Sequence, residues 1–470
     1  AAQSEAVGQN LEIRSEKQDL YGIPVTFSAL GKPLLGLRNT LLSDDQYKNY
    51  TFLTEAEMAV LSDLGYRIEP REFFGRSIYS FGSPERRIVR TVQNDFALYD
   101  HATELYEKRK PSQTPLAVGL HLYGSYNDVV HSGNVLTAGS GSIGVRVDGS
   151  ENFYYQTNNS SIIASGDSNV GLGFTYGRDN RAYISGHISA LGRQGIGIKV
   201  DMGSNIYSDL VEYRGSYIRV RTLDYLHGIV SELDAARVPL LDDLNGPQIS
   251  ELIIDGEVEG SDAAIYIDES SFVKSINVTS NARLTGGIYS TWNPRSTGTG
   301  DILVSHDAKR SVIDAVVQYP RDPHDSLTGN EFITNFLNTD INLGVTLDER
   351  NRVLYTDSSK RLPLGNDQSR VVLSGDVSSN TFKLRHIAGK STILGNVRAS
   401  SVDVFSGILS LCSPQDFATN QIGSLRVHNN AVLDYVNGKS SNTYVQSNVV
   451  LGSNVTIRVD VDAEGRILDE

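Results

Sequence analysis

The amino-acid sequence predicts an all-β fold: a right-handed, single-stranded parallel β-helix, or solenoid, with a small mixed α/β capping module at its N-terminal end. Three observations lead to this prediction. The chain of 470 residues is rich in glycine (Gly 43) and poor in methionine and tryptophan (Met 2, Trp 1). From residue 116 onward, a short apolar motif centred on glycine recurs at nearly constant spacing. No helical pattern interrupts this repeat, so the repeating unit consists of strands and turns.

The repeat is clearest in four segments: Val118-Gly119-Leu120, Ile143-Gly144-Val145, Val170-Gly171-Leu172 and Ile196-Gly197-Ile198. Their glycines are 25, 27 and 26 residues apart. Three strands of about five residues, at ~3.3 Å per residue, close one triangular coil of this length, and coils stack ~4.8 Å apart. A propeller blade would need ~40 to 50 residues. We therefore expect the four glycines to superpose along one axis, each at a bend with positive φ, and Val145, Leu172 and Ile198 to face the interior.

Residues 1–110 form the predicted capping module, because helical signals occur there. Thr54-Glu55-Ala56-Glu57 is a capping box, in which the Thr54 hydroxyl accepts the Glu57 amide and the Glu57 carboxylate reaches back. The expected helix ends at Gly65, a residue that adopts the left-handed conformation readily. A second helix is expected within 94–109, where aromatic residues recur at helical spacing before Pro111.

Residues 111–470 form the predicted solenoid stalk, whose later repeats lose the glycine motif but keep short alternating strands. Two segments interrupt the pattern: 231–248, which contains Pro239 and Pro247, and 291–330. We expect both to be extruded from the coils as loops or, in the first case, a helix. Such protruding segments commonly carry the binding specificity of a scaffold.

Charge and cysteine content narrow the class of protein further. The formal net charge of -14 argues against nucleic acid as a partner, because phosphate recognition requires Lys and Arg gathered on one face. The single Cys412 can form no internal disulfide, and this scarcity fits export across two membranes. Ala1-Ala2-Gln3-Ser4 looks like the start left by signal-peptide cleavage. No run of ~18 apolar residues occurs, so we expect no membrane insertion by this segment.

Three stretches of the predicted stalk resemble the passenger domains of classical, pertactin-like type V autotransporters: 118–125, 144–149 and 212–218. The segment 452–462 is similar to the last coils that precede the translocator barrel in such proteins. The resemblance implies an extracellular β-helix displayed on a bacterial surface, exported through the periplasm and outer membrane. It also implies a C-terminal translocator barrel in the full-length protein.

The capping module carries a second resemblance. Residues 53–66 resemble the closing helix of secreted zinc metalloproteases, and 39–43 is similar to the segment where such enzymes carry a methionine turn. Leu41 and Leu42 stand where that methionine is expected, and none of the nine histidines begins an H-E-x-x-H pair. Either the zinc-binding helix lay upstream of residue 1, or the module is a degenerate remnant that serves as a cap. The remnant is the favoured interpretation.

Several motifs suggest chemistry but fit a structural role better. Gly139–Gly144 satisfies the G-x-G-x-x-G pattern, yet a strand-like segment follows it where a nucleotide site needs a helix. Asp460, Asp462 and Glu464 imitate half of an EF-hand loop, although the twelfth ligand would fall beyond Glu470. Fragments typical of β-helix glycosidases occur in reversed order, and three acidic residues are interpreted as the outward face of one strand. These fragments and acidic residues are Asn338-Thr339-Asp340, Asp242-Asp243 and Gly186-His187, and Asp255, Glu257 and Glu259.

The sequence therefore predicts a surface-displayed adhesin or self-association scaffold that binds through shallow flanks and loops. Expected partners are a host-surface protein or glycan, or a second copy on another cell. We assign no catalytic, cofactor-binding or metal-binding residue, expect no cofactor, and do not expect an enzyme. Two alternatives stay open: a truncated or degenerate zinc metalloprotease displayed on a β-helix, and a glycan-active β-helix lyase or hydrolase.

Overall fold

The computed structural model describes residues 53–80, 82–203, 215–216, 246–292, 337–359 and 362–469 in full. It also gives the backbone of short strands outside these ranges: β1 (Asn10–Leu11), β2 (Ile23–Phe27), β3 (Pro33–Leu35), β18 (Asn205–Tyr207), β19 (Leu210–Glu212), β20 (Arg219–Asp224), β21 (Ile229–Glu232), β26 (Asp301–Ser305) and β27 (Val316–Gln318). The sequence-predicted methionine-turn segment 39–43 and Asp242-Asp243 lie outside the described residues.

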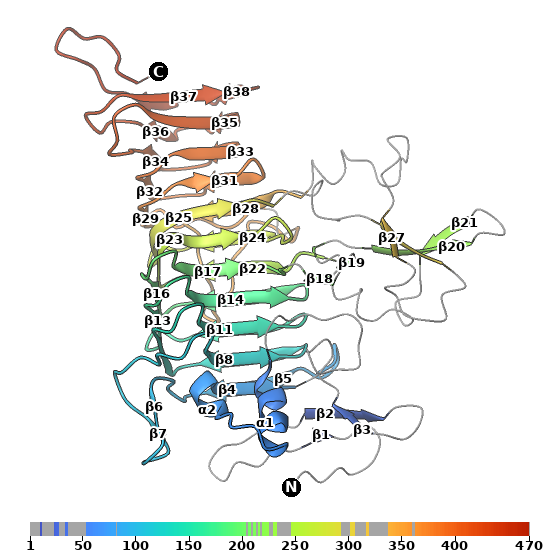
Figure 1. Cartoon of the computed structure of the whole chain (residues 1–470). Helices are drawn as coiled ribbons and strands as arrows, with labels where there is room; N and C mark the ends of the chain where they lie inside the picture. Colours follow the sequence, from blue (N-terminus) through green and yellow to red (C-terminus); the bar gives the residue numbers. More distant parts are fainter. Residues whose placement is uncertain are drawn as a thin grey trace.

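A network of 28 strands, paired in parallel, forms the body of the molecule. Each strand pairs with its counterpart one coil earlier and one coil later, so the chain winds as a solenoid whose coils are stacked from the N-terminal to the C-terminal end (Figure 1). We name the three resulting columns of strands A, B and C in the order in which each coil visits them. The prediction of a parallel, almost entirely β fold is confirmed.

Column A contains β4 (Phe74–Tyr79), β8 (Val118–Tyr123), β11 (Ile143–Asp148), β14 (Val170–Tyr176), β17 (Ile196–Val200), the second halves of β23 (Glu257–Ile267) and β25 (Arg283–Ser290), β30 (Val377–Ser378), the first halves of β33 (Val397–Val404) and β35 (Ala418–Val427), and β37 (Ser441–Val445). Column B contains β5 (Ile88–Val92), β9 (Asn127–His131), β12 (Phe153–Gln156), β15 (Asn180–Ile184), β22 (Ile249–Ile254), β24 (Ser275–Val278), β28 (Thr339–Leu343), β31 (Phe382–His386), the second halves of β33 and β35, and β38 (Val449–Leu451). Column C contains β10 (Asn134–Thr137), β13 (Ser161–Ala164), β16 (His187–Ala190), the first halves of β23 and β25, β29 (Arg370–Leu373), β32 (Lys390–Ile393), β34 (Ile408–Leu411), β36 (Val432–Asp434) and β39 (Thr456–Arg458).

The N-terminal side of the stack carries the described helices. Helix α1 (Glu55–Asp63) begins at the predicted capping box, with both reciprocal hydrogen bonds of Thr54 and Glu57 present, and Gly65 follows it with φ 95°. The short α2 (Pro70–Phe73) leads into β4. The helix predicted within 94–109 is wrong: this segment holds the antiparallel pair β6 (Tyr99–Asp100) and β7 (Leu105–Tyr106). Its aromatic spacing instead places Phe96 in the core and lets Tyr99 and Tyr106 meet edge to face.

The predicted excursions at 231–248 and 291–330 lie mostly outside the described residues. The strands β20, β21, β26 and β27 pair with one another in a separate four-stranded sheet, drawn beside the stack in Figure 1. A third excursion, which the sequence did not indicate, leaves column B after β28 and returns at β29. Thus the excursions start at corners of the coil.

The four repeat glycines superpose as predicted. A Cβ on Gly119 would meet the carbonyl oxygen of Gly144 at 2.7 Å, one on Gly144 would meet that of Gly171 at 2.7 Å, and one on Gly171 would meet that of Gly197 at 2.6 Å. The sequence-based explanation, a bend with positive φ at each glycine, is wrong, because none of the four has positive φ. Glycine is required here because the stacked backbone and an inward side chain of column C leave no room for a Cβ.

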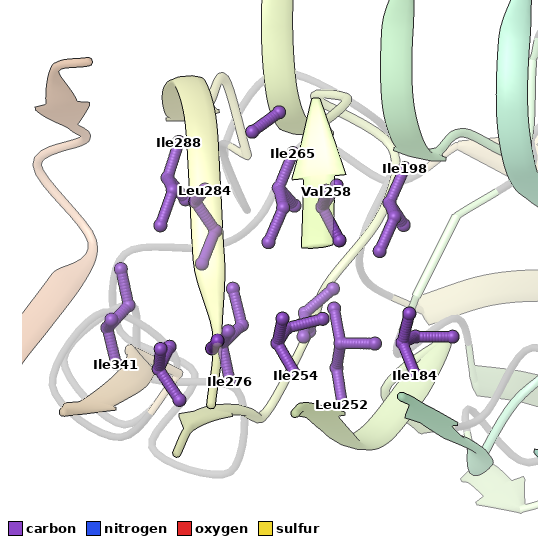
Figure 2. Close-up of a cluster of buried hydrophobic side chains, with 14 of the residues drawn as sticks. Ile184, Ile198, Leu252, Ile254, Val258, Ile265, Ile276, Leu284, Ile288 and Ile341 are labelled. Carbon is purple, nitrogen blue, oxygen red and sulfur yellow. The ribbon is translucent and has the colours of Figure 1, made fainter. Parts of the chain in front are cut away.

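The interior is filled by aliphatic ladders. Val145, Leu172 and Ile198 are fully buried, as predicted. Figure 2 shows these ladders from the coil of Ile184 and Ile198 onward, where Ile184, Leu252 and Ile254 face side chains from columns A and C across the shared core. Because each coil buries its apolar side chains against those of neighbouring coils, the core has no centre and extends along the axis.

A column of amides holds the corner between columns A and B. The Oδ1 atom of Asn152 accepts hydrogen bonds from the backbone N and Nδ2 of Asn127 at 3.0 and 3.1 Å, and Oδ1 of Asn180 accepts from the backbone N of Asn152 at 3.0 Å. Gln248 continues the column, since its Nε2 donates to the Phe174 carbonyl at 2.9 Å. These buried side chains satisfy backbone groups that the turn leaves unpaired. Gln248, predicted to lie in an extruded segment, therefore belongs to the coil.

The glycine column generates a stability prediction. In Gly144→Ala the new Cβ would lie 2.2 Å from Cγ2 of Ile162, so we expect a loss of ~1 to 3 kcal/mol from overpacking. The matched control is Gly173→Ala, in the next coil of the same column, where the nearest atom is 3.4 Å from the new Cβ. Urea unfolding of both variants is the measurement; equal midpoints would contradict the packing role of the column.

Two histidines inside the coil generate a pH prediction. Burial lowers the pKa of His131 and of His386 from 6.5 to about 4. Between these values the unfolded chain binds a proton that the folded chain does not, so stability falls as the pH drops from 6.5 towards 4, by up to roughly 3 kcal/mol per histidine. Urea unfolding at pH 7.5 and 4.5 measures this. His131→Gln should flatten the dependence; a slope equal to that of the unsubstituted chain would refute the assignment.

Candidate functional site

The outer face of column B carries a row of aromatic side chains. Strands β12 and β15 pair so that Phe153 is adjacent to Arg181 and Tyr155 to Tyr183. The Tyr155 and Tyr183 rings stack with centroids 4.8 Å apart and an interplanar angle of 29°. The Arg181 guanidinium lies 5.1 Å from the centroid of the Phe153 ring. The spacing between coils therefore brings ring against ring, and guanidinium against ring, across two neighbouring coils.

Polar groups extend this row towards the C-terminal end. The Tyr183 hydroxyl donates to Oδ2 of Asp255 at 2.6 Å, and Nδ2 of Asn277 donates to Oε1 of Glu251 at 3.3 Å. In the following coil, Nδ2 of Asn342 donates to Oδ1 of Asn277 at 2.8 Å. The flank thus places carboxylates and amides next to aromatic rings, a combination that suits recognition of a polar ligand with apolar faces.

The third excursion crosses this flank. Residues 345–359 and 362–365, which we call the strap, contain three short antiparallel segments, in which Val345 pairs with Gly365, Leu347 with Val353 and Tyr355 with Pro363. Val353 is buried in a small apolar cluster with Tyr183 and Ile253. Leu347 and Tyr355 of the strap, together with Phe153 and Tyr155, pack against that cluster. The strap therefore covers the aromatic row and returns over coils that precede it in the chain.

Two side-chain hydrogen bonds attach the strap to the flank. Nδ2 of Asn351 donates to the Tyr155 hydroxyl at 3.0 Å, and the Tyr355 hydroxyl donates to Oε1 of Glu251 at 3.1 Å. Burial, together with the neighbouring Glu251, raises the pKa of Tyr355. Burial and the hydrogen bond to Asp255 likewise raise the pKa of Tyr183. Both phenols therefore stay protonated and act as hydrogen-bond donors.

Asp340, a residue singled out in the sequence, lies on the same flank in β28. Its carboxylate contacts the Arg385 guanidinium at 2.8 Å. Burial raises the pKa of Asp340 in spite of Arg385 and the nearby Lys383 and Lys274. A carboxyl group with raised pKa beside cationic side chains has the composition of an acid or base site, although an ion pair alone also explains it.

A second polar cluster lies on the outer face of column A, near α1. Nε2 of His121 contacts Oδ2 of Asp148 at 2.8 Å, and Nε of Arg146 donates to the same oxygen at 2.9 Å. The side chains of His121 and Asp148 are each only 2% exposed. Helix α1 closes over the cluster, with the Ala56 amide donating to the Tyr79 hydroxyl at 3.2 Å.

The electrostatics of this cluster keep the carboxylate charged. Burial favours a raised pKa for Asp148, but Arg146 and His121 outweigh it and lower the pKa. Burial lowers the pKa of His121 and outweighs its hydrogen bond to Asp148, so the imidazole stays neutral. A neutral histidine and a buried ion pair can fix α1 on the first coils, and the cluster is too enclosed to offer a substrate site.

The remaining sequence-predicted motifs occupy structural positions. Gly139–Gly144 is the turn between β10 and the start of β11, as expected. The carboxylates of Asp460 and Asp462 accept hydrogen bonds from backbone amides of the chain itself. His187 and Asp340 stand in columns C and B, so the structure does not bring these glycosidase-like fragments together. Asp255 lies at a corner between β22 and β23, not on the strand of Glu257 and Glu259; the prediction of one outward face is wrong. Cys412 is a free, half-buried thiol whose pKa burial raises to about 11.

The aromatic row escaped the sequence-based prediction. Phe153, Tyr155 and Tyr183 are visible as alternating residues in two strands, but only the 28-residue register between these strands shows that the tyrosines stack. Asn351 lies 196 residues from Tyr155 in the chain, and no local pattern connects them.

In the described parts of the chain, no cluster of three or more potential ligands could hold a metal ion. No described helix is long and apolar enough to cross a membrane. Together, the stacked coils and the covered flank define a β-solenoid protein with a laterally placed candidate binding surface. Comparisons with protein families, with curated proteins and with solved structures found no match for the chain.

The cluster beneath α1 generates a third prediction. Asp148→Asn leaves the buried Arg146 without its charged partner, so we expect a loss of ~3 kcal/mol or more in the free energy of unfolding. The control is Asp167→Asn, which removes an exposed ion pair with Arg193 and should cost less than about 1 kcal/mol. Denaturant unfolding compares the two; similar small losses would show that the cluster does not stabilise the N-terminal coils.

Proposed function

We propose that the chain is the surface-displayed passenger of an autotransporter and serves as an adhesin or self-association scaffold. The observation that carries this proposal is the aromatic and polar flank of column B, held on a rigid stack of coils. Because side chains fill the interior, ligands meet the molecule only on flanks and excursions. Contacts of this kind are individually weak, and repetition along the axis gives them avidity.

Within this proposal, the solenoid winds with a right-handed sense, as crossover connections between parallel strands nearly always do. The predicted cap of residues 1–110 overlaps the stack, because β4 and β5 already belong to columns A and B. The cap proposed here is therefore the part that precedes β4, and α1 supports this role by closing over the first coils of column A. The protein is exported to the cell surface, where its partner is a host-surface protein or glycan, or another copy of itself. Nucleic acid is not proposed as a partner because the chain is strongly acidic.

A glycan-active lyase or hydrolase is the second candidate function. It is favoured by Asp340, whose pKa burial raises and which contacts Arg385 on the same flank. In that case Asp340→Asn would abolish release of products from a polysaccharide while leaving binding intact.

Adhesion of displaying cells tests the first proposal. Cells that present the full passenger should aggregate or adhere to a host or glycan surface. Phe153→Ser combined with Arg181→Ser should reduce adhesion several-fold, because it removes the exposed end of the aromatic row without emptying the core. The matched control is Phe417→Asn, which removes an exposed aromatic side chain at a distant corner. The backbone φ of 62° at this position is one that asparagine tolerates.

Trimming the excursions gives the complementary measurement. Deletions must spare Gln248, which belongs to the amide column. Shortening the excursions near 231–248 and 291–330 should lower adhesion further while circular dichroism still reports a folded stalk. If neither the flank substitutions nor the shortened excursions change adhesion, and the protein turns over a defined glycan, the enzymatic proposal replaces the binding proposal.

A further inference from the structure

We propose that the outer face of column C is a second binding surface, which recognises the anionic groups of an acidic polysaccharide through Arg370 and Lys390. Carboxylate and sulfate groups share the chemistry that these cations recognise. The surface lies on a different column from the aromatic flank of column B, so the inference goes beyond the proposed function. It stands whether or not the flank of column B binds a partner.

Two like charges stack on this face. Arg370 begins β29 and Lys390 begins β32, and the parallel register places them directly beside one another on successive coils. Both side chains are exposed, next to the buried Val371 and Ser391. In the described part of the chain, neither takes part in an ion pair. Because like charges directly opposite in a sheet destabilise it, an anion bound between the two would offset a repulsion that the fold leaves in place.

The surroundings of this pair are free of carboxylates. The outward positions of column C from the first half of β25 to β34 hold no acidic residue, although the whole chain has a net charge of -14. Arg283 adds a third cation, and its Nε lies 3.6 Å from Oε1 of Glu257 one coil earlier. The outward residues, which we call the basic face, are Arg283, Thr285, Arg370, Val372, Lys390, Thr392, Ile408 and Ser410.

Neutral groups suited to a sugar lie beside the cations. Val372 is 44% exposed and is in register with Arg283 and Thr392. An exposed aliphatic side chain can contact the apolar face of a sugar ring, and a threonine hydroxyl can exchange hydrogen bonds with sugar hydroxyls. Arg283 and Arg370 lie roughly 8 Å apart, because one coil of ~4.8 Å and two residues of ~3.3 Å separate them. The basic face can therefore bind more than one anionic group of a single polysaccharide.

The same coils show on column B why cations alone do not define this surface. There the cations are in register with carboxylates: Lys383 lies beside Asp340, and Arg426 beside Asp403. These opposite charges compensate one another within the flank. On the basic face the two cations stack with no carboxylate between them, so an anionic ligand is expected there.

The composition of the basic face favours a polysaccharide over a nucleic acid. Nucleic acids are bound by many cations that follow the phosphate backbone and by aromatic side chains that stack on bases. The basic face presents three cations and no aromatic residue. The remainder of the acidic chain repels a densely charged phosphate backbone. A polymer with more widely spaced anions and many hydroxyl groups matches these features.

Binding of defined polymers to the purified chain tests this inference. Arg370→Gln combined with Lys390→Gln should weaken the apparent Kd for polygalacturonate or dextran sulfate about tenfold, because each exposed charge pair contributes a factor of up to about five. Lys390→Arg should retain binding. The matched control is Arg398→Gln combined with Arg426→Gln, which removes the same net charge from exposed positions on columns A and B and should leave the Kd unchanged. Binding of polygalacturonate identifies the anion as carboxylate, and binding of dextran sulfate identifies it as sulfate.

Two further measurements make the outcome decisive. Uncharged dextran should not bind, and single-stranded DNA should bind about tenfold more weakly than the anionic polysaccharide. The Arg370 and Lys390 double variant should unfold at the same urea concentration as the unsubstituted chain or at a higher one, because a repulsion has been removed.

Four results would overturn the inference: no binding of either anionic polysaccharide, equal binding of dextran or DNA, an equal loss of binding in the control variant, or an earlier unfolding of the double variant. The last result would show that Arg370 and Lys390 stabilise the stack. In each case adhesion of displaying cells, measured separately, still decides the proposed function.

Discussion

The parallel hydrogen bonding between successive coils is the constraint on which the rest of the structure depends. Each coil must present its backbone to the coil before it and the coil after it, so equivalent residues are brought to ~4.8 Å from one another along the axis. At this distance each side chain contacts the equivalent side chain of the next coil, so residues of the same kind form columns along the axis. The aliphatic ladders of the core, the column of repeat glycines and the amides at the corner between columns A and B are three results of the same spacing.

The same constraint decides where the chain can vary. An extra residue inside a strand would break the register with both neighbouring coils, whereas a corner tolerates long excursions. The chain accordingly departs from the coil after β17, β25 and β28, at the ends of strands. One of these departures, the strap, folds back over earlier coils and covers Tyr183 and Ile253. A flank that would otherwise be an exposed sheet face thereby becomes a partly covered surface.

Burial of polar groups follows two patterns with different effects. The buried His121, Arg146 and Asp148 on column A are fully enclosed beside α1 and fix the N-terminal end of the stack. The phenol and carboxylate pairs on column B lie at the edge of the strap, with solvent close by. Enclosed ion pairs are costly to break because a charge remains without solvation, whereas hydrogen bonds at an accessible edge exchange readily with a ligand or water. The side chains that stabilise the stack therefore lie on column A, and those of the flank proposed for adhesion lie on column B.

The sequence by itself determined the architecture of the first coils and the helix at Thr54, because a repeat of 25 to 27 residues and a capping box are local patterns. It also indicated that Val145, Leu172 and Ile198 are interior. Local patterns failed at 94–109, where aromatic spacing suited a helix but the core required Phe96 in a parallel ladder. They could not reveal the strap or the stacked tyrosines, since Tyr155 and Asn351 meet only after seven coils of column B have set their register. Only the tertiary structure decided that surface, because contacts between residues far apart in the chain depend on accumulated register and leave no trace in any short stretch of sequence.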